Sequence, residues 1–313
     1  MKKTTFVFFG TPDYVLPILS EIYKTYHITK GESEIVAVVT QKPQATGRKK
    51  FIERTAVDNW AYKHKLPVIY DPREVPEASI GIVASYGVII PENVIKRFTH
   101  GILNIHPSLL PKYRGASPIQ AAILAGDEMT GVTIIQMDSQ MDHGPIITQA
   151  TEPILPTETA QDLRIKLFER ASDVLLELLP SYMTGKINPK PQDHEKAVMV
   201  RLVAKEHGFI PPQFLTNALE GIAPVKDWEI AFVNDLKLSP TPQVFVRLIR
   251  AMEPWPGVWT FVYPHGDEKR RLKILKAHVE GEKLVLDSVQ LEGRSVVTFK
   301  EFVAGYPNHI FKN

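Results

Sequence analysis

The first half of the chain alternates short apolar runs with amphipathic stretches, and this alternation limits the possible folds more than any other feature. The apolar runs are rich in Val, Ile and Phe and have the length of strands: Thr5–Gly10, Glu34–Thr40, Ser79–Ser85, Gly101–His106 and Gly131–Met137. The stretches between them are expected to be helices: Pro12–Tyr26, Arg54–Lys65, Pro91–Phe98 and Ala116–Ala125. Such alternation predicts an α/β, Rossmann-like fold with a doubly wound, mostly parallel sheet.

The first strand is followed by Gly10-Thr11-Pro12, which indicates a tight strand-to-helix turn with proline near the helix start. The further glycines of the dinucleotide fingerprint are missing, so neither NAD nor FAD is expected.

A long amphipathic helix is predicted over residues 159–184, where Leu163, Leu167, Ala171 and Leu175 recur at helical spacing. The polar, proline-rich stretch that follows is typical of a linker. After about residue 206, one helix (Val244–Met252) precedes closely spaced strand-like runs, as in a small OB-like β-barrel. The runs are Val258–Tyr263, Leu272–Ala277, Lys283–Leu286 and Val296–Phe299. We therefore expect a catalytic domain over residues 1–185, a linker over 186–205 and a β-barrel-like domain over 206–313. Residues 211–243 have no clear hydrophobic periodicity, so no helix or strand is assigned to them.

Composition narrows the class of protein. The chain has 313 residues and no cysteine, which removes thiolate nucleophiles, disulfides and Cys-ligated zinc. The N-terminal apolar run is too short for a signal peptide, and no stretch approaches the length of a membrane span. We expect a cytoplasmic protein without membrane contact. The net charge of +2 does not by itself indicate a nucleic-acid partner.

Residues 104–120, N-I-H-P-S-L-L-P-K-Y-R-G-A-S-P-I-Q, carry the densest chemical signal. Asn104 and His106 are two positions apart at the end of a predicted strand, so their side chains would project from one face. An amide donor beside an imidazole suits the stabilisation and protonation of a developing oxyanion. A satisfied polar pair is the structural alternative.

Asp142, in the run M-D-S-Q-M-D-H-G-P, has three interpretations. An aspartate before Gly-Pro is common in turns. A calcium loop is excluded by spacing, because Gly144 is seventh and Gln149 twelfth. Alternatively, Asp142 lies beside His106, orients the imidazole and stabilises its protonated form.

Several motifs together resemble the folate-dependent formyltransferases, most closely those that act on methionyl-tRNA. They are F-F-G-T-P-D-Y at the start, V-V-T-Q-K-P with G-R-K-K, S-Y-G-V-I-I-P, the block 104–146 and L-I-R-A-M-E-P-W-P-G-V-W-T at 248–260. The resemblance implies the formyltransferase fold and the catalytic residues Asn104, His106 and Asp142. It favours Asp142 over Asp138, because Asp142 directly precedes His143-Gly144.

The resemblance also implies a binding site for 10-formyltetrahydrofolate, the formyl donor, with no metal. Its residues would come from two segments: Ser108, Leu109, Leu110 and Pro111, and Tyr86, Gly87 and Ile90. Independently, ligands of open α/β sheets bind at the carboxyl ends of strands, where both segments are predicted to lie. A structural turn is the alternative for 108–111.

Two basic clusters could hold an extended nucleic acid such as tRNA. They contain Arg48, Lys49 and Lys50 in the first domain, and Arg270 and Arg271 in the second. The resemblance places Arg48 in a loop that contacts the tRNA acceptor end. Ordinary solvated surface is the alternative for both clusters.

The resemblance thus implies formyl transfer to the α-amine of methionyl initiator tRNA by a monomeric enzyme. A sugar-nucleotide amine formyltransferase would share Asn104, His106 and Asp142, but is not expected to combine the basic loop with the segment 248–260. A hydrolase or dehydrogenase of formyl-folate is another alternative, although a dehydrogenase would need an added redox domain. The last is a non-catalytic tRNA-binding module with a decayed site.

Overall fold

The computed structural model describes residues 3–29, 33–46, 51–265, 268–309 and 311. The chain forms two compact units. The first contains Met1–Arg114, Thr130–Glu152 and Arg164–Ala197, and the second contains Gly115–Met129, Pro153–Leu163 and Val198–Asn313.

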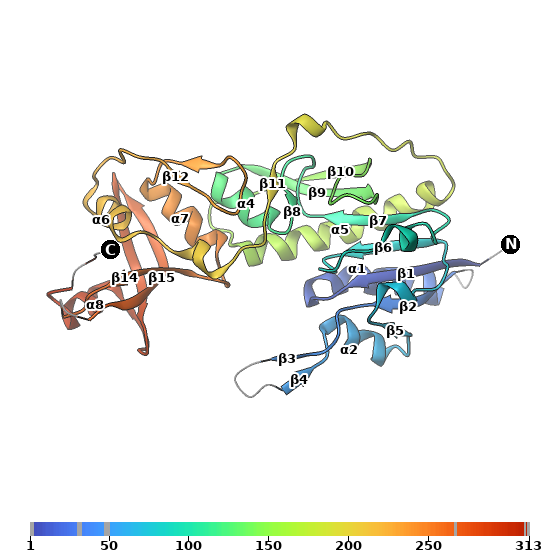
Figure 1. Ribbon diagram of the computed structural model, residues 1–313, viewed down its shortest axis with the longest axis horizontal. Helices are drawn as coiled ribbons and strands as arrows, with labels where there is room; N and C mark the ends of the chain where they lie inside the picture. Colours follow the sequence, from blue (N-terminus) through green and yellow to red (C-terminus); the bar gives the residue numbers. More distant parts are fainter. Residues whose placement is uncertain (1–2, 30–32, 47–50, 266–267, 310, 312–313) are drawn as a thin grey trace. The chain divides into compact units, whose positions relative to one another are not determined.

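The central sheet of the first unit has seven strands in the order β10-β9-β7-β6-β1-β2-β5 (Figure 1). The strands are β1 (Thr4–Gly10), β2 (Ser33–Val39), β5 (Val68–Ile69), β6 (Ile80–Ala84), β7 (Ile102–His106), β9 (Met129–Gln136) and β10 (Ile146–Pro153). The pairs from β7 through β5 are parallel, whereas β9 runs antiparallel to β7. The predicted mostly parallel sheet is therefore confirmed.

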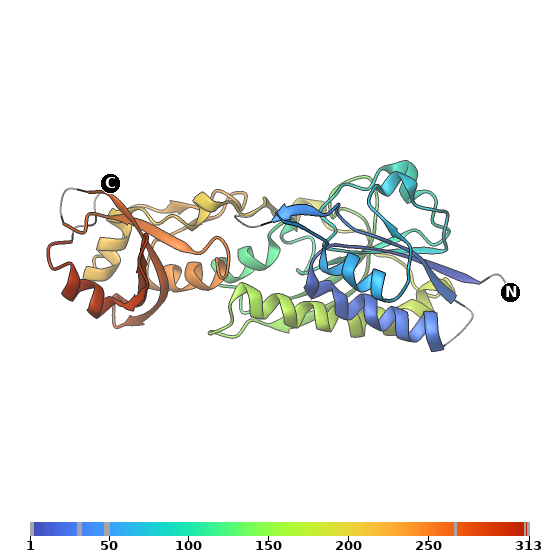
Figure 2. The same cartoon turned by 90° about the horizontal axis from the view of Figure 1, so that it is seen from below.

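Helices and short strands complete this unit: α1 (Leu16–Ile22), which continues as a π-helix over Tyr23–Thr29, β3 (Gln44–Thr46), β4 (Phe51–Glu53), α2 (Ala56–Lys63), α3 (Glu92–Ile95) and α5 (Ala160–Met183). Helix α2 begins at Ala56 because the Thr55 side chain caps it, accepting a hydrogen bond from the Asp58 N–H. Figure 2 shows α1 and α5 side by side along one face of the sheet. The rings of Tyr14 and Phe168 pack together there, with their centroids 4.9 Å apart.

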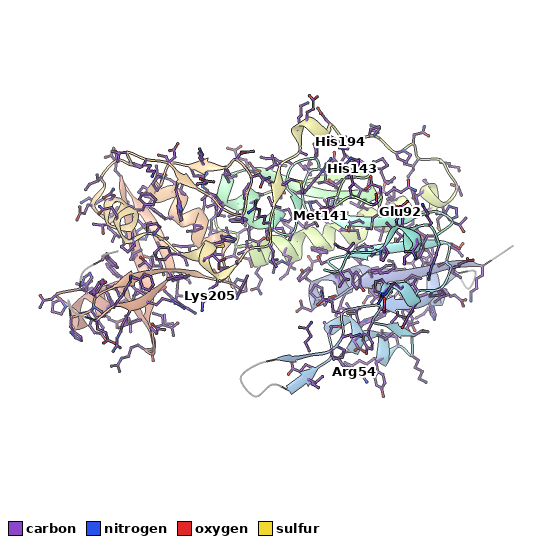
Figure 3. The ribbon with its side chains drawn as sticks, in the orientation of Figure 1. Arg54, Glu92, Met141, His143, His194 and Lys205 are labelled. Atoms are coloured by element: carbon purple, nitrogen blue, oxygen red, sulfur yellow. The ribbon has the colours of Figure 1, made fainter. Side chains whose placement is uncertain are left out.

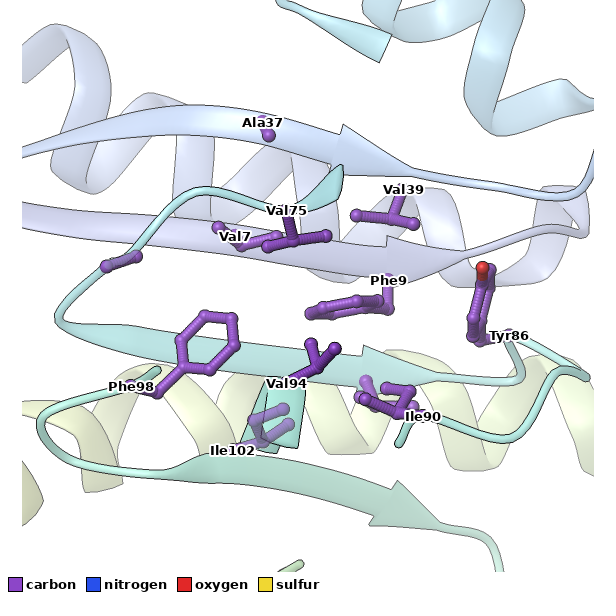
Figure 4. Close-up of a cluster of buried hydrophobic side chains, with 12 residues drawn as sticks. Val7, Phe9, Ala37, Val39, Val75, Tyr86, Ile90, Val94, Phe98 and Ile102 are labelled. Carbon is purple, nitrogen blue, oxygen red and sulfur yellow. The ribbon is translucent and has the colours of Figure 1, made fainter. Parts of the chain in front are cut away.

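The core on the opposite face follows from the two-residue period of the strands. Along β1, Val7 and Phe9 join a buried cluster with Val39 of β2 and with Val94 and Phe98 (Figure 4). Residues Phe6 and Phe8 alternate with them and are also buried. Both faces of β1 are thus covered, which is why this strand is a continuous apolar run.

The second unit contains short strands that form two-stranded pairs, and a four-stranded antiparallel sheet. Its elements, beginning with a strand that straddles the unit boundary, are β8 (Arg114–Gly115), α4 (Pro118–Ala125), β11 (Met199–Val200), α6 (Pro212–Glu220), β12 (Trp228–Glu229), β13 (Lys237–Leu238), α7 (Pro242–Ala251), β14 (Val258–Val262), β15 (Arg270–Glu280), β16 (Lys283–Leu291), β17 (Val296–Thr298) and α8 (Phe299–Gly305). The sheet has the order β14-β15-β16-β17. The expected small β domain is confirmed, and the segment without a period holds α6, β12 and β13.

The short segments Gly115–Met129 and Pro153–Leu163 cluster with the second unit through α7. Helix α7 packs against α4, and Arg250 of α7 donates to the carbonyls of Leu155 and Glu158. In the predicted linker, residues up to Ala197 cluster with the first unit. The assignment of functions to residues 1–185, 186–205 and 206–313 stays a prediction.

In the described part of the chain, no helix combines the length and apolarity needed to cross a membrane.

Candidate active site

Three of the predicted site residues lie together at the carboxyl end of β7. Asn104 and His106 occupy alternate positions of this strand, and Asp142 belongs to the connection between β9 and β10. The Asn104 side chain donates from Nδ2 to Oδ1 of Asp142 over 2.9 Å. The other carboxylate oxygen of Asp142 lies 3.6 Å from Nδ1 of His106. The Asp142 carboxylate therefore faces both the amide and the imidazole.

A backbone carbonyl fixes the imidazole of His106. Its Nε2 lies 2.8 Å from the carbonyl oxygen of Tyr113, and the imidazole is almost completely buried. Because a carbonyl oxygen can only accept, Nε2 carries a proton. The other ring nitrogen, Nδ1, is the one that lies on the side of Asp142. The sequence did not predict this role for Tyr113, since a carbonyl contact leaves no side-chain signal.

The loop that carries Asp142 has an unusual backbone. Asp142 has a φ of 50°, in the left-handed region that aspartate tolerates better than most residues. Gly144 follows, and a Cβ there would lie 1.8 Å from the carbonyl oxygen of Gln136. Further along, the His143 imidazole contacts the carboxylate of Asp138 at 2.6 Å, so the rejected alternative Asp138 has a different partner.

The residues predicted to bind folate differ in accessibility. Ser108, Leu110, Tyr86 and Ile90 are buried. The Ser108 hydroxyl donates to the Lys112 carbonyl, and the Tyr86 ring packs in the core cluster of Figure 4. The others, Leu109, Pro111 and Gly87, are at least partly accessible, and Gly87 is followed by the exposed side chains of Val88 and Ile89. The folate role of all seven stays a prediction.

The predicted basic residues of the first unit, Arg48, Lys49 and Lys50, lie outside the described residues. In the second unit, the Arg270 guanidinium pairs with Glu268 at 2.8 Å, which raises the pKa of Arg270. The Arg271 guanidinium carbon lies over the Trp259 ring, 4.5 Å from its centroid. Their role in tRNA binding stays a prediction.

An open depression of about 760 Å³ lies elsewhere, between α2 and β5. It is lined by Arg54, Asp58, Tyr62, Lys63, Lys65, Leu66, Pro67, Val68 and Tyr70, which include none of the predicted site residues. Its buried carboxylate, Asp58, already accepts a hydrogen bond from Tyr70 and lies 3.7 Å from Arg54. The chemistry of the trio at β7 makes that place, rather than this depression, the candidate active site. Among the described residues, no group of three or more His, Cys, Asp or Glu could hold a metal ion.

Two protein-family models match the chain. The family model described as formyl transferase matches residues 2–179, and the model of the formyl transferase C-terminal domain matches residues 239–284. The first match covers more than half of the chain and includes Asn104, His106 and Asp142. The chain belongs to the formyl transferase family.

Individual relatives support the same assignment. A formyl transferase family member named methionyl-tRNA formyltransferase, from Chloroflexus aurantiacus (strain ATCC 29366 / DSM 635 / J-10-fl), is 36% identical over 285 residues, which cover 88% of this chain and 81% of the relative. A relative of the same name from Listeria monocytogenes serotype 4b (strain F2365) is 33% identical over 99% of this chain and 98% of its own length.

Solved structures of formyl transferases share the fold. The sugar 3N-formyl transferase WlaRD, solved in the presence of dTDP and 5-N-formyl-THF, has a TM-score of 0.62 at 16% identity and covers 95% of this chain and 97% of its own. The methionyl-tRNA formyltransferase from Clostridium thermocellum has a TM-score of 0.52 at 18% identity, over 92% and 98% of the two chains. Because both structures are similar, the fold alone does not distinguish a sugar acceptor from a tRNA acceptor.

Proposed function

We propose that this formyl transferase moves the formyl group of 10-formyltetrahydrofolate to the α-amino group of methionyl initiator tRNA. The observation that carries the proposal is the contact of the Asp142 carboxylate with Asn104 and its approach to His106 at the end of β7. These groups supply a neutral donor, a proton-exchanging imidazole and a charge that stabilises the imidazolium.

The trio acts on the transfer as follows. The α-amine needs little activation, because its ordinary pKa of about 7.7–8.0 leaves a useful neutral fraction at neutral pH. As the amine attacks the formyl carbon, negative charge develops on the formyl oxygen, and the second N–H of the Asn104 amide donates to it. The bond from the formyl carbon to the folate nitrogen then breaks. His106 transfers a proton through Nδ1 from the attacking amine to that leaving nitrogen, while Asp142 stabilises the imidazolium.

The folate fits the carboxyl edge of the sheet. Val88 and Ile89 are 45% and 80% exposed, and this pair of apolar side chains lies in the connection that follows β6, four and five residues after its last residue Ala84. Exposed apolar side chains beside a few polar groups are typical of a ligand-binding edge. We assign Gly87, Leu109 and Pro111 to the accessible part of this site, and Tyr86, Ser108, Leu110 and Ile90 to its buried support.

The choice of tRNA over an amino sugar rests on the relatives and on the second unit. Both of the relatives described above carry the name methionyl-tRNA formyltransferase, at 33–36% identity. Strand β14 and the start of β15 also carry two cation–aromatic pairs: Arg271 lies over Trp259, and Lys269, which directly precedes β15, lies over Phe261 at 4.1 Å. Cations beside aromatic rings suit a nucleic-acid surface. Monomeric state, cytoplasmic location and preference for initiator tRNA remain expectations within this proposal.

An acceptor comparison tests the proposal. The purified protein would be incubated with labelled 10-formyltetrahydrofolate and either methionyl initiator tRNA, a dTDP-linked amino sugar or buffer alone. We expect label on the α-amine of methionyl-tRNA and much slower transfer to the sugar. Faster transfer to the sugar would support the alternative acceptor. Release of free formate in buffer at the same rate as in the tRNA reaction would indicate a hydrolase.

A further inference from the structure

The proline-rich stretch predicted to be a linker returns to the loop of Asp142. Lys190 exchanges two backbone hydrogen bonds with Ile146, of 2.7 and 2.8 Å, at the start of β10. Two residues later, Gln192 is only 6% exposed. Its Nε2 donates to the carbonyl oxygens of Asp142 and Gly144, both at 2.8 Å. One amide side chain thus holds the loop on both sides of His143.

A buried arginine orients that amide. Arg114 donates to Oε1 of Gln192 from Nε at 3.1 Å and from Nη2 at 2.6 Å. The same Nη2 lies 2.8 Å from Nδ1 of His194. The His194 ring stacks on the His143 ring, with the ring centroids 4.0 Å apart and an interplanar angle of 1°. Figure 3 labels the two histidines. The Gln192 amide therefore uses both of its donors and accepts two hydrogen bonds, so it has one defined orientation.

The loop needs such support because its conformation is strained. A φ of 50° at a residue with a Cβ costs free energy and persists where the surroundings impose it. The direction of the Asp142 carboxylate depends on this backbone, since the side chain has few rotatable bonds. A shift of the loop would move the carboxylate away from Asn104 and His106.

Arg114 also places a positive charge near the loop that carries Asp142. Burial lowers the pKa of Arg114, and the negative charges of Asp142 and Asp138 raise it in return. An arginine remains protonated in proteins, so a positive charge lies near the carboxylates of Asp142 and Asp138.

We propose that Gln192 is a positioning residue for Asp142, and that Arg114 acts through it by fixing the orientation of its amide. Both hydrogen bonds that Gln192 donates go to backbone carbonyls of the loop, so its effect on the trio passes through the loop backbone. The kinetic readout below rests on the proposed function, whereas the structural readout does not.

Gln192→Glu separates the two contacts of this side chain. The carboxylate still accepts from Arg114, but it loses both donors and faces two carbonyl oxygens. Gln192→Ala removes both contacts and leaves Arg114 without this acceptor. Lys190→Ala is the matched control, because it lies in the same stretch, its side chain is exposed and its backbone bonds to Ile146 are retained.

We expect Gln192→Glu to lower kcat roughly 10- to 100-fold with little change in KM for either substrate, since a misplaced catalytic group costs on this order. Gln192→Ala should lose similar activity and more thermal stability, and Lys190→Ala should match wild type. A wild-type kcat in Gln192→Glu would overturn the proposal, because the two hydrogen bonds that Gln192 donates to the loop would then not be needed for activity. An increase in KM at constant kcat would also overturn it, because Gln192 would then act in binding.

Amide hydrogen exchange of the peptide spanning residues 137–146, without substrates, gives the second readout. Both Gln192 variants should exchange faster than wild type there, and Lys190→Ala should not. Unchanged exchange in Gln192→Glu would overturn the positioning role whatever the activity. If wild type fails to formylate methionyl-tRNA but the exchange changes as expected, the proposed function fails and the positioning role stands. Should Gln192→Ala not fold, Gln192→Glu decides alone.

Discussion

The side-chain amide of Asn104 donates a 2.9 Å hydrogen bond to the carboxylate of Asp142, which lies 38 positions later in the chain. The bond ties the end of a parallel strand to the loop beyond its antiparallel neighbour β9. It also fixes the orientation of the amide: one of its two N–H groups donates to Asp142, and in the proposed mechanism the other donates to the reacting oxygen.

Asn104→Asp should place two carboxylates against each other at this point. Like charges at hydrogen-bond distance repel, so we expect the variant to lose about 1–2 kcal/mol of unfolding free energy at pH 7. Formyl transfer should fall on the order of 100-fold or more, because the oxyanion donor is lost. Urea denaturation and steady-state rates measure the two effects.

The double variant Asn104→Asp with Asp142→Asn is the control for this pair. It exchanges the two groups, and the asparagine at 142 can donate to the aspartate at 104. Most of the lost stability should return, while transfer should stay low because His106 no longer faces a carboxylate. Additive losses of stability in the double variant would show that the two side chains do not interact.

Tyr86→Phe should not destabilise the protein. The Tyr86 side chain is 2% exposed, and its hydroxyl has no hydrogen-bond partner among the described residues. Removing a buried unsatisfied hydroxyl is expected to leave the unfolding free energy at pH 8 unchanged or about 1 kcal/mol higher. A clear loss of stability would mean that this hydroxyl makes a bond that the fold needs.

The same variant has a distinct alkaline profile. Burial, together with the charge of Asp71, raises the pKa of Tyr86 to about 12. A tyrosine ionises near 10 in the unfolded chain, so its stabilising contribution is complete below pH 10 and is lost as pH rises through 12. Between pH 9 and 12, wild type should therefore lose about 2 kcal/mol relative to Tyr86→Phe. The pKa of Tyr182 is also raised to about 12. Tyr182 is present in both proteins, so its contribution to the pH dependence cancels in the comparison. If the unfolding free energies of wild type and Tyr86→Phe changed equally between pH 9 and 12, this account would be contradicted.

Replacing Arg270 and Arg271 by alanine together should weaken tRNA binding with little effect on kcat at saturating tRNA. Phosphate contacts position a nucleic acid, whereas in the proposed mechanism the chemistry takes place at the trio. Each lost contact should reduce the log–log slope of affinity against salt by roughly 0.7–0.9. Filter binding at several salt concentrations measures the slope. Arg164→Ala, on α5, is a control for the loss of an arginine outside this cluster and should leave the slope unchanged. Equal slopes in all proteins would make the cluster ordinary surface.

Gly144→Ala should damage both fold and activity, because its new Cβ would meet the Gln136 carbonyl. Backbone must move to admit it, which we expect to cost more than about 2 kcal/mol and to displace Asp142. Gly305→Ala, where no neighbouring atom lies within 4 Å, is the control and should be neutral or slightly stabilising. Thermal melts compare the two, and equal melting temperatures would contradict the close approach.

The sequence predicted the strands whose apolar runs are uninterrupted. Phe6 through Phe9 are buried on both faces of the sheet, and that burial produced the apolar run. Strand β10 was not predicted, because an edge strand with the polar residues of T-Q-A-T-E lacks such a run. Segment 211–243 was left without assignment, since α6 is short and β12 and β13 have two residues each.

The site was predictable where side chains carry the chemistry. Asn104 and His106 follow from spacing along one strand, and the contact with Asp142 required the resemblance to a family. The contacts of Tyr113 and Gln192 with the site were not predicted. Tyr113 acts through its carbonyl, and Gln192 lies in a stretch whose prolines and polar residues are typical of linkers. Only the folded chain brings that stretch to the loop.

Single-turnover transfer of the labelled formyl group to methionyl-tRNA tests the central claim most directly, since it measures the chemical step of the trio. With saturating tRNA, His106→Ala and Asp142→Ala should each slow the step roughly 100- to 1,000-fold. The double variant should be no slower than the worse single variant, because the two residues act as a unit. Single variants that transfer at near wild-type rates would contradict the assignment of the active site. So would losses that multiply in the double variant, because the two side chains would then act independently.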